Sequence, residues 1–361
     1  MTENYNNPID LYSMLPEELT EYFISIGEKP FRARQVFPLL AKGVRISEMT
    51  SLSKALREKL LSSTLDTLPV VREKLTSKID GTVKYLFGLH DGNVIESVLM
   101  RYKHGNTLCI SSQVGCRMGC RFCASTIGGK VRDLLPSEMQ GQIIAAELDS
   151  GERVSNVVMM GIGEPLDNFD NVTKFLRLVG HPDGLNIGYR HISLSTSGVV
   201  PGIYKLAELD LPITLSISLH APNDTRRSEI MPINKKWNIG ELLAACVDYY
   251  QTTGRRISFE YTLISGKNDS VSEAEELANL LNGAFRNTGA PIHVNLIRVN
   301  EVSETGFKRG SRESVNAFAK ALESRGITAT VRRRLGSDVN AACGQLRRSS
   351  MQKQNESENE T

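Results

Sequence analysis

CISSQVGCRMGCRFCAS, residues 109–125, contains four of the six cysteines of the chain. Three of them, Cys116, Cys120 and Cys123, fall within eight residues. Thiolates at these spacings can converge from one loop on an iron-sulfur cluster. A structural zinc ion requires four protein ligands, and the nearest fourth, Cys109, belongs to the predicted strand before the loop. The spacing therefore favours a cluster with one iron left open, with zinc as the alternative.

The composition is typical of a globular enzyme. The chain has 361 residues, of which 40% are hydrophobic and 23% are charged. Its length predicts one main domain with a smaller appendage. No apolar run is long enough to cross a bilayer, and the opening residues lack the features of a signal peptide, so we expect a cytoplasmic protein without membrane contact. Six cysteines are too few for a disulfide scaffold.

Basic residues are concentrated in two parts of the chain. The net charge of +2 is too small to indicate a nucleic-acid-binding protein by itself. Clustered basic side chains can contact phosphates, although a solvated surface is the alternative for each cluster. The first cluster, between Lys29 and Lys59, has eight basic and two acidic residues. The second consists of Arg332, Arg333, Arg334, Arg347, Arg348 and Lys353.

The apolar and β-branched runs predict an α/β fold. Helical segments are expected to begin near Pro16, Phe31 and Leu52. Two strands, residues 84–89 and 94–102, are joined by Asp91-Gly92, which is typical of a hairpin turn. Seven further runs alternate with helical stretches at about thirty residues per unit, which favours a partial (β/α)6 barrel. These runs are residues 107–112, 156–160, 191–196, 213–218, 257–263, 292–297 and 327–332.

We divide the chain into four parts. Residues 1–75 are expected to form a helical domain, 76–104 a β-hairpin linker and 105–346 the barrel. Residues 347–361 are polar and acidic without periodicity, and we expect them to be disordered. Residues that carry chemistry in such a barrel follow the C-terminal ends of its strands. Five segments have this position. They are the cysteine loop and residues 161–165, 195–198, 218–220 and 298–300.

Longer strings of the sequence resemble the RlmN/Cfr family of RNA methyltransferases, which belongs to the radical S-adenosylmethionine superfamily. The cysteine motif and the GEP segment ending at Pro165 resemble the superfamily. The strings SSQVGC, STSGVVP and HAPND are closer to the RlmN branch than to the Cfr branch. The family strings, in order, are CISSQVGCRMGCRFCAS, NVVMMGIGEPLDN, LSTSGVVP, SLHAPND, MPINKK and DVNAACGQL.

The resemblance implies a 4Fe-4S cluster on Cys116, Cys120 and Cys123, with S-adenosylmethionine on the open iron. It also implies methylation of carbon 2 of an adenosine in 23S ribosomal RNA and of an adenosine near tRNA position 37. Two S-adenosylmethionine molecules and a methylcysteine would be used. The alternatives are Cfr-type methylation of carbon 8 and a non-catalytic, metal-stabilised RNA-binding protein. The expected partners are rRNA, tRNA and an electron donor such as flavodoxin or ferredoxin. The enzyme is expected to be a monomer.

Three residues match the reactive positions of the family. Cys343 matches the methyl carrier, Cys109 the resolving thiol that would form a disulfide with it, and Glu96 the proton acceptor. Strand alternation places Glu96 on the face that also carries apolar residues, where we expect an apolar setting and a better base near neutrality. A glutamate that reaches solvent from an edge strand is the alternative. Cys246 is expected to be an unreactive core residue.

Seven further residues match the cofactor pocket of the family. Gly163 and Glu164 match contacts to the methionyl group, and Ser195 and Asn300 match polar contacts to the ribose or carboxylate. Residues 218–220 match the strand-end segment of the same pocket, namely Ser218, Leu219 and His220. In isolation, each residue type is more common at strand ends as a turn former or a core residue.

Overall fold

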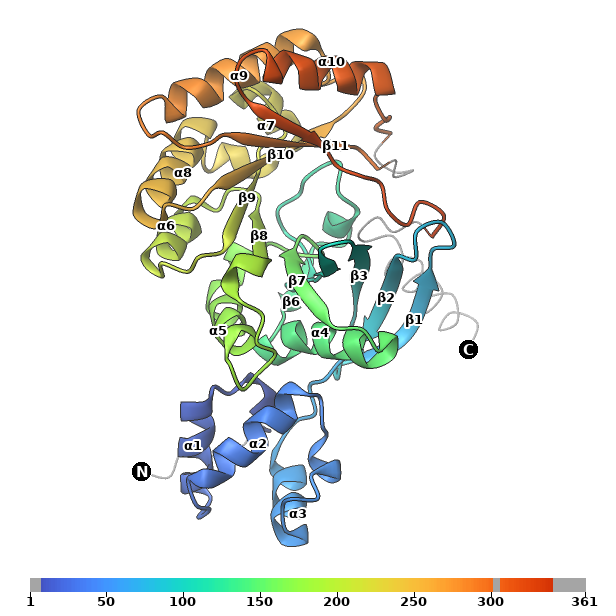
Figure 1. The fold of residues 1–361 in the computed structure, drawn as a ribbon, viewed down its shortest axis with the longest axis vertical. Helices are drawn as coiled ribbons and strands as arrows, with labels where there is room; N and C mark the ends of the chain where they lie inside the picture. The colour runs from blue at the N-terminus through green and yellow to red at the C-terminus, as the bar shows by residue number, and fades with distance from the viewer. Residues whose placement is uncertain (1–7, 301–305, 340–361) are drawn as a thin grey trace.

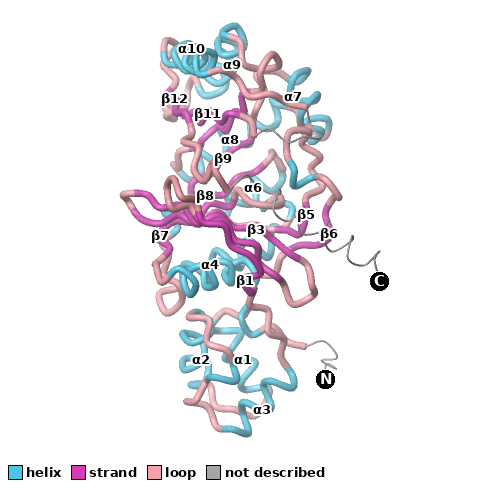
Figure 2. Tube along the Cα trace, turned by 90° about the vertical axis from the view of Figure 1, so that its right-hand side faces the viewer, coloured by secondary structure: helices cyan, strands magenta, loops and turns pink. Residues whose placement is uncertain are grey.

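The computed structural model describes residues 8–300 and 306–339, which form a helical region at one end of a large sheet (Figure 1). The helical region contains α1 (Pro16–Ser25), α2 (Phe31–Ala41) and α3 (Lys54–Ser63). The three predicted helices are therefore confirmed. They bury a second hydrophobic core, which Ile144 and Leu178 of the main domain complete. Figure 2, turned by 90°, shows the three helices as a separate group below the sheet.

The helical segment ends earlier than predicted. After α3, the chain forms the strand β1 (Val70–Thr76), so the expectation of helix to residue 75 is wrong for residues 70–75. β1 pairs antiparallel with β2 (Val83–Gly88), which pairs with β3 (Val94–Tyr102) through the predicted hairpin. Most side chains of β1 are exposed and several are charged, as is common on edge strands. Its composition therefore carries little of the usual strand signal.

Parallel strands continue the sheet and occupy the seven predicted runs. They are β4 (Gly105–Cys109), β7 (Val154–Met159), β8 (Ile192–Thr196), β9 (Thr214–Ser218), β10 (Ile257–Leu263), β11 (His293–Arg298) and β12 (Thr328–Val331). In the described residues, the strand order is β1-β2-β3-β4-β7-β8-β9-β10-β11-β12. Each strand from β4 onward is parallel to the next. The predicted α/β fold with a partial parallel barrel is confirmed.

Helices fill the crossovers between the parallel strands. They are α4 (Pro136–Ser150), α5 (Phe169–Gly180), α6 (Val200–Glu208), α7 (Asp224–Ile230), α8 (Ile239–Thr253), α9 (Val271–Phe285) and α10 (Arg312–Glu323). Except for α7, whose Ile230 belongs to a smaller separate cluster, their apolar faces pack with the strands in the main core, where Cys246 is fully buried as expected. Within the described residues, no helix is both long and apolar enough to span a bilayer.

A small two-stranded ribbon, which the sequence did not predict, flanks the cysteine loop. β5 (Gln113–Gly115) pairs antiparallel with β6 (Lys130–Asp133). Gly115 has φ +78°, and a Cβ at this position would lie 2.0 Å from the Gly129 carbonyl oxygen. A side chain cannot be accommodated there, so glycine sets the close approach of the two strands that hold the loop.

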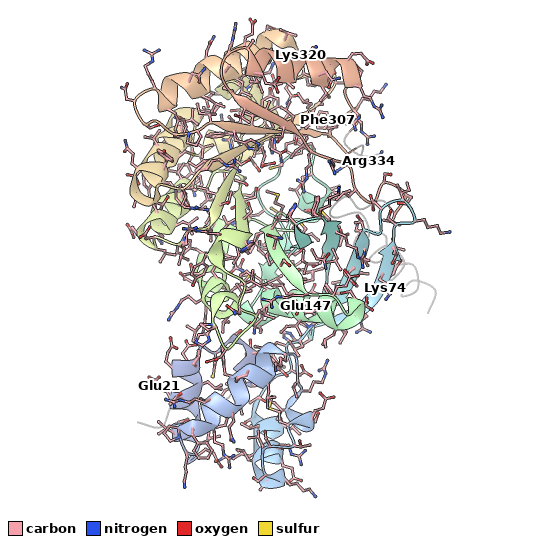
Figure 3. The ribbon with its side chains drawn as sticks, in the orientation of Figure 1. Glu21, Lys74, Glu147, Phe307, Lys320 and Arg334 are labelled. Atoms are coloured by element: carbon pink, nitrogen blue, oxygen red, sulfur yellow. The ribbon has the colours of Figure 1, made fainter. Side chains whose placement is uncertain are left out.

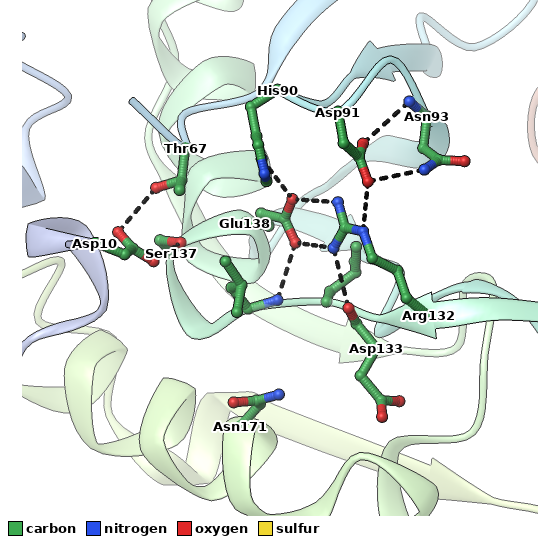
Figure 4. A network of polar contacts seen from close by, with 12 residues as sticks. Asp10, Thr67, His90, Asp91, Asn93, Arg132, Asp133, Ser137, Glu138 and Asn171 are labelled. Atoms are coloured by element: carbon green, nitrogen blue, oxygen red, sulfur yellow. Dashed lines mark hydrogen bonds and ion pairs between the residues drawn. The ribbon is translucent and has the colours of Figure 1, made fainter. Parts of the chain in front are cut away.

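A buried polar network joins the hairpin, β6 and α4 (Figure 4). The Glu138 carboxylate on α4 is fully buried and accepts hydrogen bonds of 2.7 Å from both terminal nitrogens of Arg132. Arg132 also donates to Asp91 at the hairpin turn, over 2.6 Å. In the same turn of α4, Ser137 donates to Asp10 over 2.6 Å. The first turn of α4 is therefore tied to both the hairpin and the helical region.

We expect Arg132→Met to lower the free energy of unfolding by about 2–4 kcal/mol, because Glu138 would keep its buried charge without its main partner. Urea unfolding followed by circular dichroism measures the change. Arg177→Met is the matched control, because Arg177 pairs with Glu17 while their side chains remain 54% and 58% exposed. This control should change the free energy by less than about 1 kcal/mol. Equal changes in the free energy of unfolding would contradict the role of Arg132 as the main partner of the buried Glu138 charge.

Candidate active site

A cavity of about 540 Å³ lies at the C-terminal ends of the parallel strands. Consecutive strands of the barrel contribute to its wall. In parallel sheets these ends meet at one edge, which is where barrel enzymes place their chemistry. The lining residues at or after strands β4, β7, β8, β9, β10 and β11 include Cys109, Gly161, Ser195, Ser218, Thr262 and Arg298. The strand-end segments that barrel topology singles out therefore meet at one cavity.

Cys116, Cys120 and Cys123 all line this cavity. Backbone hydrogen bonds hold their loop, including one from Cys116 N to Gly129 O of 3.0 Å. Burial raises the pKa of the Cys116 thiol to about 12 and also raises the pKa of Cys120. Buried thiols of this kind ionise when a metal supplies positive charge. The donor set therefore suits a metal group that binds thiolates.

Among the described residues, no three His, Cys, Asp or Glu side chains stand close enough to hold one metal ion together. The irons of an iron-sulfur cluster are held by cysteine thiolates spread around the cluster rather than converging on one point. Three cysteines around one cavity are therefore compatible with a cluster.

The glycine-rich loop after β7 packs backbone to backbone against the segment that leads into the cysteine loop. Gly161 N donates to Ile110 O over 3.0 Å, and a Cβ on Gly161 would lie 2.5 Å from that oxygen. Gly163 has φ +111°, and its Cβ would lie 2.6 Å from Cβ of Gln113. Both positions require glycine because any side chain would separate the two loops. Gly163 also lines the cavity, as predicted for a cofactor contact.

Glu164 lines the cavity and connects the glycine loop to the end of β8. Its Oε2 accepts hydrogen bonds from Ser197 N over 2.6 Å and from Ser197 Oγ over 2.7 Å. Burial raises the pKa of this carboxyl, while the Ser197 hydrogen bonds act in the opposite direction. Ser197 was not among the predicted site residues, although it lies in the predicted strand-end segment 195–198.

Arg227 on α7 is a second residue that sequence reasoning missed. Its side chain is fully buried and donates to the carbonyl oxygens of Ser197 over 2.6 Å, Ser218 over 3.1 Å and Leu219 over 3.1 Å. It also donates to Asn234 Oδ1 over 3.0 Å. One guanidinium therefore holds the ends of β8 and β9 together beneath the cavity. In the sequence, Arg227 appears only as a charged residue shortly after the HAPND string, and nothing there indicated this role.

The strand-end segment after β9 divides between the cavity and the core. Ser218 and His220 line the cavity, whereas the Leu219 side chain is buried in the main core and is not among the lining residues. His220 Nδ1 accepts a hydrogen bond of 2.9 Å from Thr262 N. Burial lowers the pKa of His220 to about 3, so the ring is neutral. Its edge packs on Phe122 in the cysteine loop, with centroids 4.9 Å apart.

The three predicted reactive residues have different locations. Cys109 lines the cavity. Glu96 is fully buried, does not belong to the described lining residues, and has its Oε2 3.2 Å from Lys84 Nζ. The expected apolar setting of Glu96 is therefore wrong, because strand alternation within β3 could not reveal a lysine on the neighbouring strand. Cys343 lies outside the described residues, and its pairing with Cys109 stays a prediction.

Several charged residues also line the cavity. Asn300 lines it together with arginines from three segments, and Arg334 lies where the chain leaves β12 (Figure 3). The arginines are Arg298, Arg309, Arg332, Arg333 and Arg334. Glu260 also lines the cavity, and burial raises its pKa although Asn295 donates to it over 2.7 Å. A charged residue in the middle of the β10 run was the available signal for this missed residue.

Comparisons with known proteins agree with this architecture. The radical SAM superfamily matches residues 110–281, and the ribosomal RNA large subunit methyltransferase N-terminal domain matches residues 9–65. A protein of Alkaliphilus oremlandii, named "Probable dual-specificity RNA methyltransferase RlmN", is 53% identical over 95% of this chain and 99% of its own. A protein of the same name from Clostridium botulinum (strain Eklund 17B / Type B) is 54% identical over 92% and 94%.

A solved structure resembles the chain over most of its length. The radical SAM methyltransferase from Sphaerobacter thermophilus has a TM-score of 0.87 and 42% sequence identity, and the match covers 94% of this chain and 99% of that one. The fold and the site thus define a radical S-adenosylmethionine protein. Within that superfamily, the chain belongs to the RlmN family. This membership confirms the predicted cofactors, a 4Fe-4S cluster and S-adenosylmethionine.

We expect Arg227→Met to weaken S-adenosylmethionine binding about tenfold or more and to lower the free energy of unfolding by about 2–4 kcal/mol. Both effects follow because the substitution leaves buried carbonyl groups at two cavity loops without their donor. Equilibrium dialysis of the reconstituted protein and urea unfolding measure them. Arg226→Met is the control, since the Arg226 side chain is 45% exposed and forms its ion pairs with Glu229 and Glu273 rather than with the cavity loops. The role of Arg227 is refuted when the two variants bind the cofactor equally well.

Proposed function

We propose that this protein methylates carbon 2 of an adenosine in 23S ribosomal RNA and of an adenosine in the position-37 region of tRNAs. The observation that carries the proposal is that Cys109 faces the same cavity as Cys116, Cys120 and Cys123. A thiol beside the metal-binding cysteines is what a cysteine-mediated transfer requires. The names of the relatives, which describe dual-specificity RNA methyltransferases, support the substrate class.

The chemistry of the target explains why a thiol relay is needed. Carbon 2 of adenine is electron-poor and has no lone pair, so it cannot displace the methyl group of a sulfonium directly. When bound at Cys116, Cys120 and Cys123, the cluster together with S-adenosylmethionine supplies the radical that removes a hydrogen atom. The chain's own residues must therefore carry the methyl group and release the product.

Cys343 and Cys109 share these two tasks in the proposed cycle. The Cys343 thiolate accepts a methyl group from a first S-adenosylmethionine, and a second one is consumed to activate that S-methyl group. The activated carbon joins the adenine ring and leaves a covalent bond between Cys343 and the RNA. The adduct would give up one electron to the cluster and its ring proton to Glu96. Cys109 then attacks the Cys343 sulfur, and the carbon–sulfur bond breaks with its electron pair on the methylene carbon, which takes a proton and becomes the methyl group. The resulting disulfide is reduced before the next turnover.

The other cavity residues support binding of the cofactor. Gly163 and Glu164 would face the methionyl group, while Ser195, Ser218, His220 and Asn300 lie on the wall available to the ribose and carboxylate. Leu219 would contribute through its backbone, since its carbonyl is bound by Arg227. A reductant of the flavodoxin or ferredoxin type would deliver electrons to a monomeric enzyme.

RNA is the substrate that uses both basic clusters. Arg332, Arg333 and Arg334 line the cavity, where they can hold the phosphates on either side of an adenosine that is turned out of its helix. The helical region, residues 9–65, would contact the RNA farther from the target base. Some of its basic residues already have acidic neighbours, such as Arg32 with Glu28 at 3.5 Å. These basic residues would position the RNA through its phosphates and would not recognise its base sequence.

The central prediction concerns Cys343. We expect the reconstituted wild type to form 5′-deoxyadenosine when reduced with S-adenosylmethionine and RNA, and Cys343→Ala to reduce that product by about 100-fold or more, because the substitution removes the hydrogen donor. Chromatography of the reaction mixture measures it. Cys246→Ala, in the buried core, is the control and should retain the product. Equal yields from wild type and Cys343→Ala would contradict the proposal, and mass analysis of the nucleoside distinguishes carbon 2 from carbon 8.

A second prediction concerns RNA affinity. Exchanging Arg32 and Arg34 for Gln should weaken rRNA-fragment binding several-fold and lower the slope of log affinity against log salt by about 1–2, because up to two phosphate contacts are lost. Filter binding over a salt series measures both quantities. Exchanging Arg312 and Lys320, on the exposed face of α10, for Gln is the control. An unchanged salt slope would remove the helical region from the proposed RNA surface.

A further inference from the structure

Lys84 and Glu96 form an ion pair inside the sheet. Both side chains are fully buried, and Lys84 Nζ lies 3.2 Å from Glu96 Oε2. The register of β2 and β3 places Lys84 opposite Val98 and Leu86 opposite Glu96, so the two charges share one face. Moving two charges out of water is costly, and an apolar pair of similar volume usually stabilises a fold as well or better. Stability alone therefore does not account for the pair.

The face that carries the pair leads to the reactive thiol. Val98 pairs with Cys109 across β3 and β4, and both line the cavity. Glu96 stands two residues before Val98 and therefore on the same face of β3. Glu96 is therefore diagonally adjacent to Cys109 and lies behind the cavity-lining residues Val98 and Cys109, without lining the cavity itself.

The backbone beneath Glu96 is fixed to the cofactor loop. Ser111 Oγ donates to the Glu96 carbonyl oxygen over 2.7 Å and accepts from Ile162 N over 3.1 Å. Gln142 Oε1 accepts from Ser97 Oγ over 2.7 Å and from Ser111 N over 2.8 Å. These hydrogen bonds fix the backbone of Glu96, so the carboxylate can change direction mainly by rotation about the side-chain bonds. The contact with Lys84 restricts that rotation.

We propose that Lys84 is the positioning residue that holds Glu96 as a correctly directed carboxylate for proton removal from the target ring. This inference rests on the proposed function. In that step, the C–H bond of the methylene-bearing ring carbon breaks, the proton binds a Glu96 oxygen and the bonding electrons stay in the ring. Glu96 then holds the proton until it is passed on before the next turnover.

The test compares Lys84→Met with Lys84→Arg in the full-length reconstituted enzyme. Lys84→Met should retain 5′-deoxyadenosine formation within about twofold, accumulate RNA that stays attached to protein after denaturation, and release methylated RNA about tenfold more slowly or worse. Lys84→Arg keeps the charge and should recover at least part of that release. Lys74→Met is the matched control, because Lys74 on β1 is 48% exposed and pairs with Asp149 on α4. It should behave as the wild type.

A charge exchange, with Lys84→Glu and Glu96→Lys combined, keeps an ion pair but moves the carboxylate to β2. It should fold, as judged by thermal unfolding and iron content, and accumulate the covalent RNA adduct. Normal release by this exchange variant or by Lys84→Met overturns the proposal. Loss of 5′-deoxyadenosine in a folded Lys84→Met also overturns it, because the lysine would then act on the cofactor. If neither variant folds, the pair is structural and the proposal is withdrawn.

The wild-type reaction separates this inference from the function on which it rests. A wild type that forms neither methylated RNA nor an adduct refutes the proposed function and the inference with it. An active wild type whose Lys84 variants release product normally refutes the inference alone.

Discussion

The contact between the ends of β4 and β7 is the constraint on which the site depends. Gly161 meets the carbonyl of Ile110 so closely that a methyl group would not fit between them, and Ser112 N donates to Ile162 O over 2.9 Å. This contact sets the distance between the loop that carries the cysteines and the loop that approaches the cofactor. The cavity exists at this place because two backbone segments, and not two side chains, meet there.

Buried polar groups extend the same arrangement around the barrel. Glu164 reaches Ser197 at the end of β8, and Arg227 connects Ser197 with Ser218 and Leu219 at the end of β9. Each of these groups would be costly to bury alone, so the loops are stable together in one relative position. Hydrogen bonds between buried groups therefore fix the relative positions of the loops that line the cavity.

The sequence predicted the strands and the strand-end residues well because both are local properties. Apolar alternation and glycine spacing identify a strand and its loop without knowledge of the neighbours. Lys84, Ser197 and Arg227 escaped prediction because their roles depend on which strand lies next to which and in what register. The strand β1 escaped because an exposed edge strand has no buried face to leave a periodic pattern. The resemblance to a family supplied the roles of Cys109 and Cys343, which spacing alone does not give.

The sheet has two free edges in the described part of the chain, at β1 and β12, and does not close on itself. A closed barrel receives its ligand through the mouth alone, which suits a small molecule or the end of a polymer. An open one gives lateral access, so a residue far from either end of a long polymer can be reached without threading. An open sheet can therefore receive a target that lies within a large folded polymer, where no free end is available. The enzyme need not be larger when the polymer is longer.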